Sequence, residues 1–164
     1  MKKTFAIALI STAFAALVGS MAEAADLRSW DQKLGPGSRF VVLSKFNNEA
    51  VLDQETQLVW AREPVGPAVY TSVYLTCLNS VVGGRTGWRV PTIYELRSLL
   101  GMDLTVAFPN LTGYPYWSQS PAYGSPGSTD LMVSHLYDAP AFVEHLQDNH
   151  IYRALCVRGH SAQP

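Results

Sequence analysis

The chain has 164 residues, with 12 Lys and Arg against 13 Asp and Glu, so its formal net charge is −1. This length accommodates one domain of ordinary size and is too short for two large ones. The balanced charge excludes the broad basic surface that nucleic-acid binding requires, although a local basic cluster remains compatible with it.

The first 24 residues have the three parts of a secretory signal peptide. Lys2 and Lys3 give the positive start, residues 5–18 form a largely apolar run, and Ala22-Glu23-Ala24 provides a small-residue cleavage site. The run is shorter than the roughly 20 residues that span a bilayer, which argues against a retained anchor. We expect cleavage after Ala24 and export to the periplasm or the medium. Cleavage removes two lysines and one glutamate, which takes the net charge from −1 to −2.

The mature chain is expected to begin with a loose arm, residues 25–39, which is polar and contains Gly and Pro. A strand should follow at residues 40–43. Residues 50–52 and 58–60 are apolar and flank a polar five-residue turn, which is the pattern of a β-hairpin. The sequence therefore predicts three strands in the first third of the mature chain.

A helix is predicted over residues 69–78, because Val69, Val73 and Cys77 recur with helical spacing on one face. Cys77 would then point into the core. The glycine pair at 83–84 is where this helix is expected to stop.

A second helix follows Pro91 and begins with a capping box. In the pattern Thr92-x-x-Glu95, each of the two side chains accepts a hydrogen bond from the backbone amide of the other residue. The same pair could be read as an acid and a base, but helix capping is the favoured interpretation. Gly101 is suited to the left-handed residue that ends the helix.

The segment from residue 102 to 127 is aromatic, rich in Gly and Pro and without helix signals, so it is expected to be a long functional loop. Strands are expected at residues 131–137, 141–146 and 152–157. The order of elements predicts an α+β fold, with two helices packed on a mostly antiparallel sheet.

The mature chain has two cysteines, Cys77 and Cys156, and export favours a disulfide between them. The alternative, a redox or metal-binding thiol pair, normally has its cysteines two or three residues apart. A bridge would tie the first helix to the last strand.

Several segments resemble the Lcl C-terminal domain family, named after a bacterial collagen-like adhesin. The resemblance runs through most of the mature chain and gives a domain at residues 40–160, after the arm. The matching segments, in order, are Val51–Trp60, Gly87–Leu96, Phe108–Asn110, Tyr116–Ser120 and Cys156–Gly159.

The resemblance implies a C-type-lectin-like fold, secretion or surface display and, as in the named member, adhesion to sulfated polysaccharides. The chain departs from the family in three respects. Gln57 stands where the family commonly has Gly, Val90 replaces the usual Leu, and no collagen-like tract precedes the domain. The calcium-binding sugar signatures of animal lectins are also absent, so calcium-dependent sugar binding by that mechanism is not expected.

No complete catalytic or metal site is visible, and we expect a non-enzymatic protein without a cofactor. Ser118 and Ser120 lack the G-x-S-x-G elbow of a hydrolase. The segment around Pro91 is also similar to formylglycine-generating enzymes, but these need a cysteine pair near the C-terminal end. The histidines lack the spacing of zinc ligands; they are His135, His145, His150 and His160.

The tryptophans Trp60, Trp88 and Trp117 are expected to fill the core, and Arg89 and Arg158 to anchor loops by hydrogen-bonding to carbonyls. Ligand contacts are expected from aromatic residues of the long segment, because a tyrosine offers a flat apolar face and a polar tip. A cluster of Arg85, Arg89 and Arg97 could hold sulfated sugars. The ligand-contact candidates are Tyr114, Tyr116, Tyr123 and Arg85.

Two functions follow as alternatives. One is a secreted or periplasmic binding module for a glycan or an extracellular protein. The other is an envelope subunit whose partner is another protein. An enzyme similar to the formylglycine-generating enzymes is the least favoured interpretation.

Overall fold

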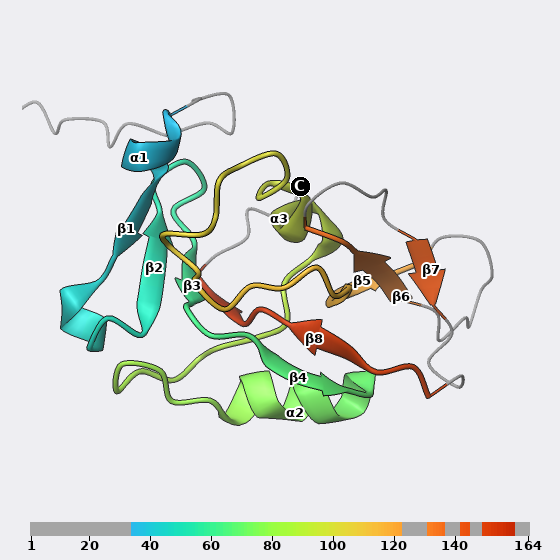
Figure 1. The fold of residues 1–164 in the computed structure, drawn as a ribbon. Coiled ribbons are helices and arrows are strands. Elements are labelled where there is room, and N and C mark those ends of the chain that lie inside the picture. The colour runs from blue at the N-terminus through green and yellow to red at the C-terminus, as the bar shows by residue number, and fades with distance from the viewer. Residues whose placement is uncertain (1–33, 123–130, 137–141, 145–148, 160–164) are drawn as a thin grey trace, which may run out of the picture.

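The computed structural model describes residues 34–122, 131–136, 142–144 and 149–159, which form two β-sheets with short helices around them (Figure 1). The helices are α1 (Pro36–Arg39), α2 (Tyr70–Asn79) and α3 (Ile93–Arg97), with a 3-10 turn at Ser44–Phe46. The strands are β1 (Phe40–Val42), β2 (Ala50–Asp53), β3 (Val59–Ala61), β4 (Val65–Ala68), β5 (Tyr116–Pro121), β6 (Leu131–Ser134), β7 (Phe142–Glu144), β8 (Tyr152–Ala154) and β9 (Val157–Arg158).

The first sheet has the strand order β1-β2-β3-β9, and all its neighbouring strands are antiparallel. It contains the predicted hairpin, in which Val51 lies opposite Trp60. The polar turn between β2 and β3 is held by Asp53, which accepts hydrogen bonds from the amide of Glu55 at 3.0 Å and the hydroxyl of Thr56 at 2.9 Å. Short polar side chains commonly close turns in this way.

The second sheet has the order β4-β8-β5-β6-β7, and only β5 and β8 are parallel. The expected α+β fold with mostly antiparallel strands is therefore confirmed, although the strands form two sheets. The expectation that residues 102–127 form one long loop is wrong, because β5 lies at the centre of this sheet. The partners of β5 are distant in sequence, and the Gly and Pro residues on either side of it hide the strand from local patterns.

The predicted strand at 152–157 is also corrected, since the chain passes from one sheet to the other within it. Tyr152–Ala154 pairs in the second sheet, Val157–Arg158 in the first, and Leu155 and Cys156 between them are buried. Cys156 is bonded to Cys77 of α2 with the Cα atoms 5.4 Å apart, which confirms the predicted disulfide. The bridge therefore joins α2 to the crossing point between the sheets.

Both predicted helices are present. α2 ends at Asn79, earlier than the glycine pair, and buries Val73 and Cys77. α3 begins with the predicted capping box: Thr92 accepts from the Glu95 amide at 3.2 Å, and Glu95 accepts from the Thr92 amide at 2.7 Å. Among the described residues, no helix is long and apolar enough to cross a membrane.

The end of the expected loose arm is instead fixed to the first sheet. Residues 36–39 form α1, and the side chain of Arg39 is only 5% exposed. Its guanidinium donates to both carboxylate oxygens of Asp53 at 2.8 Å and contacts Glu55 at 2.8 Å. A buried arginine needs such partners. Asp53 is the last residue of β2, and Glu55 lies in the turn that follows it.

Strand β4 was not predicted, because its sequence Val-Gly-Pro-Ala reads as a turn. Proline cannot donate a ladder hydrogen bond and is confined to sheet edges. β4 is such an edge, since β8 is the only strand paired with it among the described residues.

Gly83 is the position where we expect a small substitution to be poorly tolerated. Its φ is +58°, and an added Cβ would lie 2.4 Å from the Cα of Phe46. Gly83→Ala should lower the free energy of unfolding by roughly 3 kcal/mol, from left-handed strain and overpacking together. Gly84→Ala is the control, because its φ is +71° but nothing lies within 4 Å of its added Cβ. Urea denaturation should show the larger loss for Gly83→Ala, and equal losses would contradict the predicted contact.

Candidate functional site

The three tryptophans that were expected to fill the core are buried there. Trp60, Trp88 and Trp117 are each at most 1% exposed. Trp88 donates its indole N–H to the carbonyl of Arg85 at 2.7 Å, and Trp117 donates to the carbonyl of Ala68 at 3.0 Å. These residues hold the two sheets and their connections together, as predicted.

The central motif is a structural unit that surrounds the buried carboxylate of Glu95. Arg89 donates to both Glu95 oxygens, at 2.7 and 2.8 Å, while Glu95 also caps α3. Pro91 is buried, and its carbonyl accepts from the amide of Gln119 in β5 at 2.8 Å. The motif therefore fixes α3 against β5.

The structure places the two arginines that were expected to anchor loops. Arg89 donates to the carbonyls of Val90 and Gly159 at 3.4 Å, as expected. Its shorter contacts are with the Glu95 carboxylate, so it adds no free charge to a cluster with Arg85 and Arg97. Arg158 lies in β9 opposite Val59, in a strand rather than in a loop. Arg85 is exposed, with its guanidinium carbon 5.9 Å from the ring centroid of Phe46.

The three tyrosine candidates have different positions. Tyr123 lies outside the described residues. Tyr116 is fully buried in the same core cluster as Leu155, because this part of the central strand β5 is covered on both faces. It is therefore corrected from a ligand contact to a core residue. Tyr114 is 53% exposed and remains a candidate.

Tyr114 lies beside Arg153 of β8, a residue that sequence reasoning missed. The guanidinium carbon of Arg153 is 5.7 Å from the centroid of the Tyr114 ring, within the range of a cation–π contact. The backbone fixes this geometry, since the Arg153 amide donates to the carbonyl of Pro115 at 3.1 Å. We call Thr112, Tyr114 and Arg153 the Tyr114–Arg153 site.

Two polar atoms of this site are buried and have no hydrogen-bond partner in the described part of the chain. They are Nε of Arg153 and Oγ1 of Thr112. The Thr112 backbone is itself held, because its amide donates to the phenol oxygen of Tyr116 at 3.3 Å. Leaving a buried polar atom without a hydrogen bond costs about 1–3 kcal/mol. A ligand or an ordered water is therefore expected to form a hydrogen bond with each of these atoms.

The charge of Arg153 is also uncompensated within the described residues, where the ion pairs involve Arg39 and Arg89 instead. The site thus combines a half-exposed aromatic face with a half-buried cation. The sequence around each of these residues does not predict the site, because only the parallel pairing of β5 and β8 brings Tyr114 and Arg153 together.

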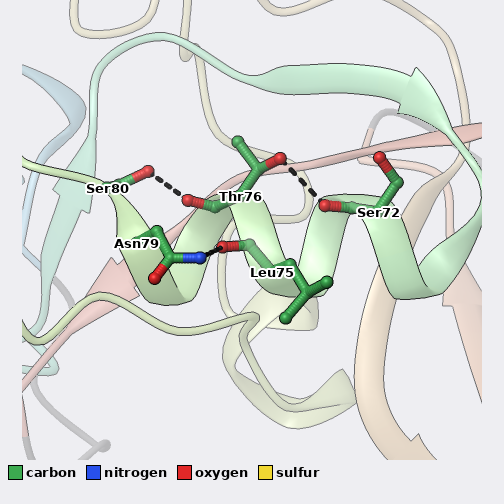
Figure 2. Close-up of a pocket in the computed structure, with 5 residues that line it drawn as sticks. All are labelled: Ser72, Leu75, Thr76, Asn79 and Ser80. Atoms are coloured by element: carbon green, nitrogen blue, oxygen red, sulfur yellow. Dashed lines mark hydrogen bonds between the residues drawn. The ribbon is translucent and has the colours of Figure 1, made fainter.

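The outer face of α2 has a shallow depression, and three of the polar side chains that line it already donate hydrogen bonds within the helix. Figure 2 shows Thr76, Asn79 and Ser80 donating to helix carbonyls one turn earlier, at 2.8, 2.9 and 2.6 Å. No titratable group lines this depression. We therefore do not place a polar ligand there.

The remaining candidate residues either form hydrogen bonds within the fold or lie outside the described ranges. The Ser118 hydroxyl donates to the carbonyl of Met132, and the Ser120 hydroxyl accepts from the amide of Ile93. Within the described ranges, no three His, Cys, Asp or Glu residues gather as a metal site would require. His145 and His160 fall outside those ranges.

The comparisons with known proteins give one match. The sequence model of the Lcl C-terminal domain family matches residues 49–158, which run from β2 to β9 and include the disulfide and the Tyr114–Arg153 site. No curated protein and no solved structure matches the chain.

Proposed function

We propose that this chain, which belongs to the Lcl C-terminal domain family, is an exported, non-enzymatic module that binds an acidic glycan at Tyr114 and Arg153. The observation that carries the proposal is the contact between the exposed Tyr114 ring and an arginine with no carboxylate partner among the described residues. A pyranose ring can pack on the tyrosine face, and a sulfate or carboxylate can take the guanidinium donors.

Three further points support the proposal. The disulfide fits an oxidising compartment outside the cytoplasm. A C-type-lectin-like arrangement of the two sheets, which family resemblance implies, would present a ligand from the segment before β5. That segment, residues 102–115, passes over to the four-stranded sheet before it returns to β5, as Figure 1 shows, and Phe108 packs on Phe40 of β1 there.

A glycan array of mature protein, with sulfated, uronic-acid and neutral sugars and with and without chelator, tests this function. We expect the acidic sugars to give the strongest signals and the chelator to change nothing. Tyr114→Ala should weaken the best hit about five-fold, which corresponds to the roughly 1 kcal/mol of an aromatic contact. Loss of binding on chelation, or full binding by Tyr114→Ala, would place the site elsewhere.

A second candidate function is that of an envelope subunit with a protein partner. It rests on the outer face of α2, which has no charged residue and exposes Tyr74, Leu75 and Leu78 by 40%, 54% and 52%. Exposed apolar patches of this kind mark protein contacts. This function would be favoured if wild type captured one envelope protein, Leu75→Glu did not, and the glycan array showed no binding.

A further inference from the structure

A cavity of about 180 Å³ lies between α1, β1 and the segment that follows α3, and no residue of the Tyr114–Arg153 site lines it. Its walls are mostly apolar, and it has one carboxylate. The lining residues are Gly37, Phe40, Val42, Asp103, Val106 and Ala107.

The walls of this cavity are held in place by contacts outside it. The Phe40 ring packs edge-on against Phe108 at 5.7 Å, and the Arg39 guanidinium covers it at 5.0 Å. Ala107 is tied to the β3–β4 connection, because its carbonyl accepts from Nε of Arg62 at 3.0 Å. The cavity is therefore preformed rather than a gap between loose segments.

Asp103 lines this cavity, and one of its carboxylate oxygens has no hydrogen bond within the described part of the chain. Its Oδ1 accepts from both the hydroxyl and the amide of Thr105, at 2.6 and 3.1 Å, whereas Oδ2 has no partner among the described residues. The two bonds from Thr105 lower the pKa of the Asp103 carboxyl below its usual value, so the group is ionised at neutral pH.

Two arginines contact residues that line the cavity. Arg39 is paired with the carboxylates of Asp53 and Glu55, and Arg62 donates to the carbonyls of Val106 and Ala107. With Asp103 there are three carboxylates and two guanidinium groups, so one negative charge remains in excess around the cavity. A ligand that complements the cavity is therefore apolar along its length and positive at one end.

We propose that this cavity binds a lysine side chain of a protein partner. A lysine has a four-carbon apolar stem and a compact ammonium that needs only one acceptor oxygen, whereas arginine prefers a bidentate carboxylate, and one Asp103 oxygen is already used. The cavity is smaller than the roughly 300–1,000 Å³ of small-molecule sites, which suits a single side chain. Val106, 81% exposed at the rim, offers an apolar contact to residues that flank the lysine.

The probe is N-acetyl-lysine N-methylamide, titrated into mature protein and followed by amide chemical shifts. The matched probe is N-acetyl-norleucine N-methylamide, which has a stem of similar length and no ammonium. We expect millimolar binding of the lysine probe, with shifts confined to residues 37–42 and 103–107, and binding of the norleucine probe several-fold weaker. Equal binding of the two probes, shifts elsewhere, or no shifts at tens of millimolar would overturn the proposal.

Two variants test the two parts of the site. Asp103→Asn keeps an oxygen for Thr105 and should weaken the lysine probe about two- to five-fold, as expected for an exposed ion pair. Gly37→Leu should block the cavity without distorting α1, because nothing lies within 4 Å of an added Cβ there. Glu63→Gln, which removes an exposed charge that does not line the cavity, should leave binding unchanged. Unchanged binding by Gly37→Leu would contradict the site.

Discussion

Replacement of both cysteines, in a Cys77→Ala/Cys156→Ala variant, is expected to lower the free energy of unfolding by about 4–5 kcal/mol. The disulfide closes a loop with a sequence separation of 79 residues, so its removal restores much entropy to the unfolded chain. Both cysteines are at most 1% exposed, and the bridge joins α2 to the point where the chain crosses between the sheets. Urea denaturation of the wild-type and double-variant proteins measures the difference.

The control for the disulfide is the same denaturation with a reducing agent. Wild type should then approach the stability of the double variant, while the double variant should not change. A loss below about 1 kcal/mol would mean that the bridge adds little beyond the packing around it.

Asp53→Ala is expected to lower the free energy of unfolding by about 3–5 kcal/mol, because it leaves a buried guanidinium without its main partner. Asp53 is fully buried, and it accepts two hydrogen bonds from Arg39 and two more within the β2–β3 turn. The variant should therefore loosen both the turn and the attachment of α1. Urea denaturation again gives the magnitude.

Asp103→Ala is the matched control, since Asp103 is also an aspartate that caps its own turn but is fully exposed. Its effect should be much smaller than that of Asp53→Ala. Similar losses from the two variants would contradict the role of burial. A double-mutant cycle with Arg39→Met should show strong coupling to Asp53, because the two side chains are in direct contact.

Features that depend on neighbouring residues were predictable from the sequence. The capping box needs only Thr92 and Glu95, three residues apart, and the β2–β3 hairpin needs two apolar segments around a polar turn. The disulfide followed from there being two cysteines in a chain that we expected to be exported. These predictions were confirmed because each rests on a local pattern or on a simple count.

Features that depend on distant partners were missed or misplaced. Arg39 reads as part of a polar arm, and only the fold brings it to Asp53. β5 has the composition of a loop, and its pairing with β8 cannot be read from either segment. The same pairing brings Arg153 to Tyr114 and turns Tyr116 inward. Of the two residues at the centre of the candidate site, the sequence therefore predicted Tyr114 and missed Arg153.

The most direct test of the proposed function compares an acidic glycan with its neutral analogue on Arg153→Met. This variant keeps the apolar stem but removes the charge beside Tyr114. Calorimetric titration should show roughly ten-fold or greater loss of affinity for the acidic glycan, as expected for charge-assisted hydrogen bonds, and little change for the neutral analogue. Arg97→Met, which removes an exposed cation on α3, should bind both as wild type does. Unchanged affinity of Arg153→Met for the acidic glycan would contradict the proposal that Arg153 holds the ligand.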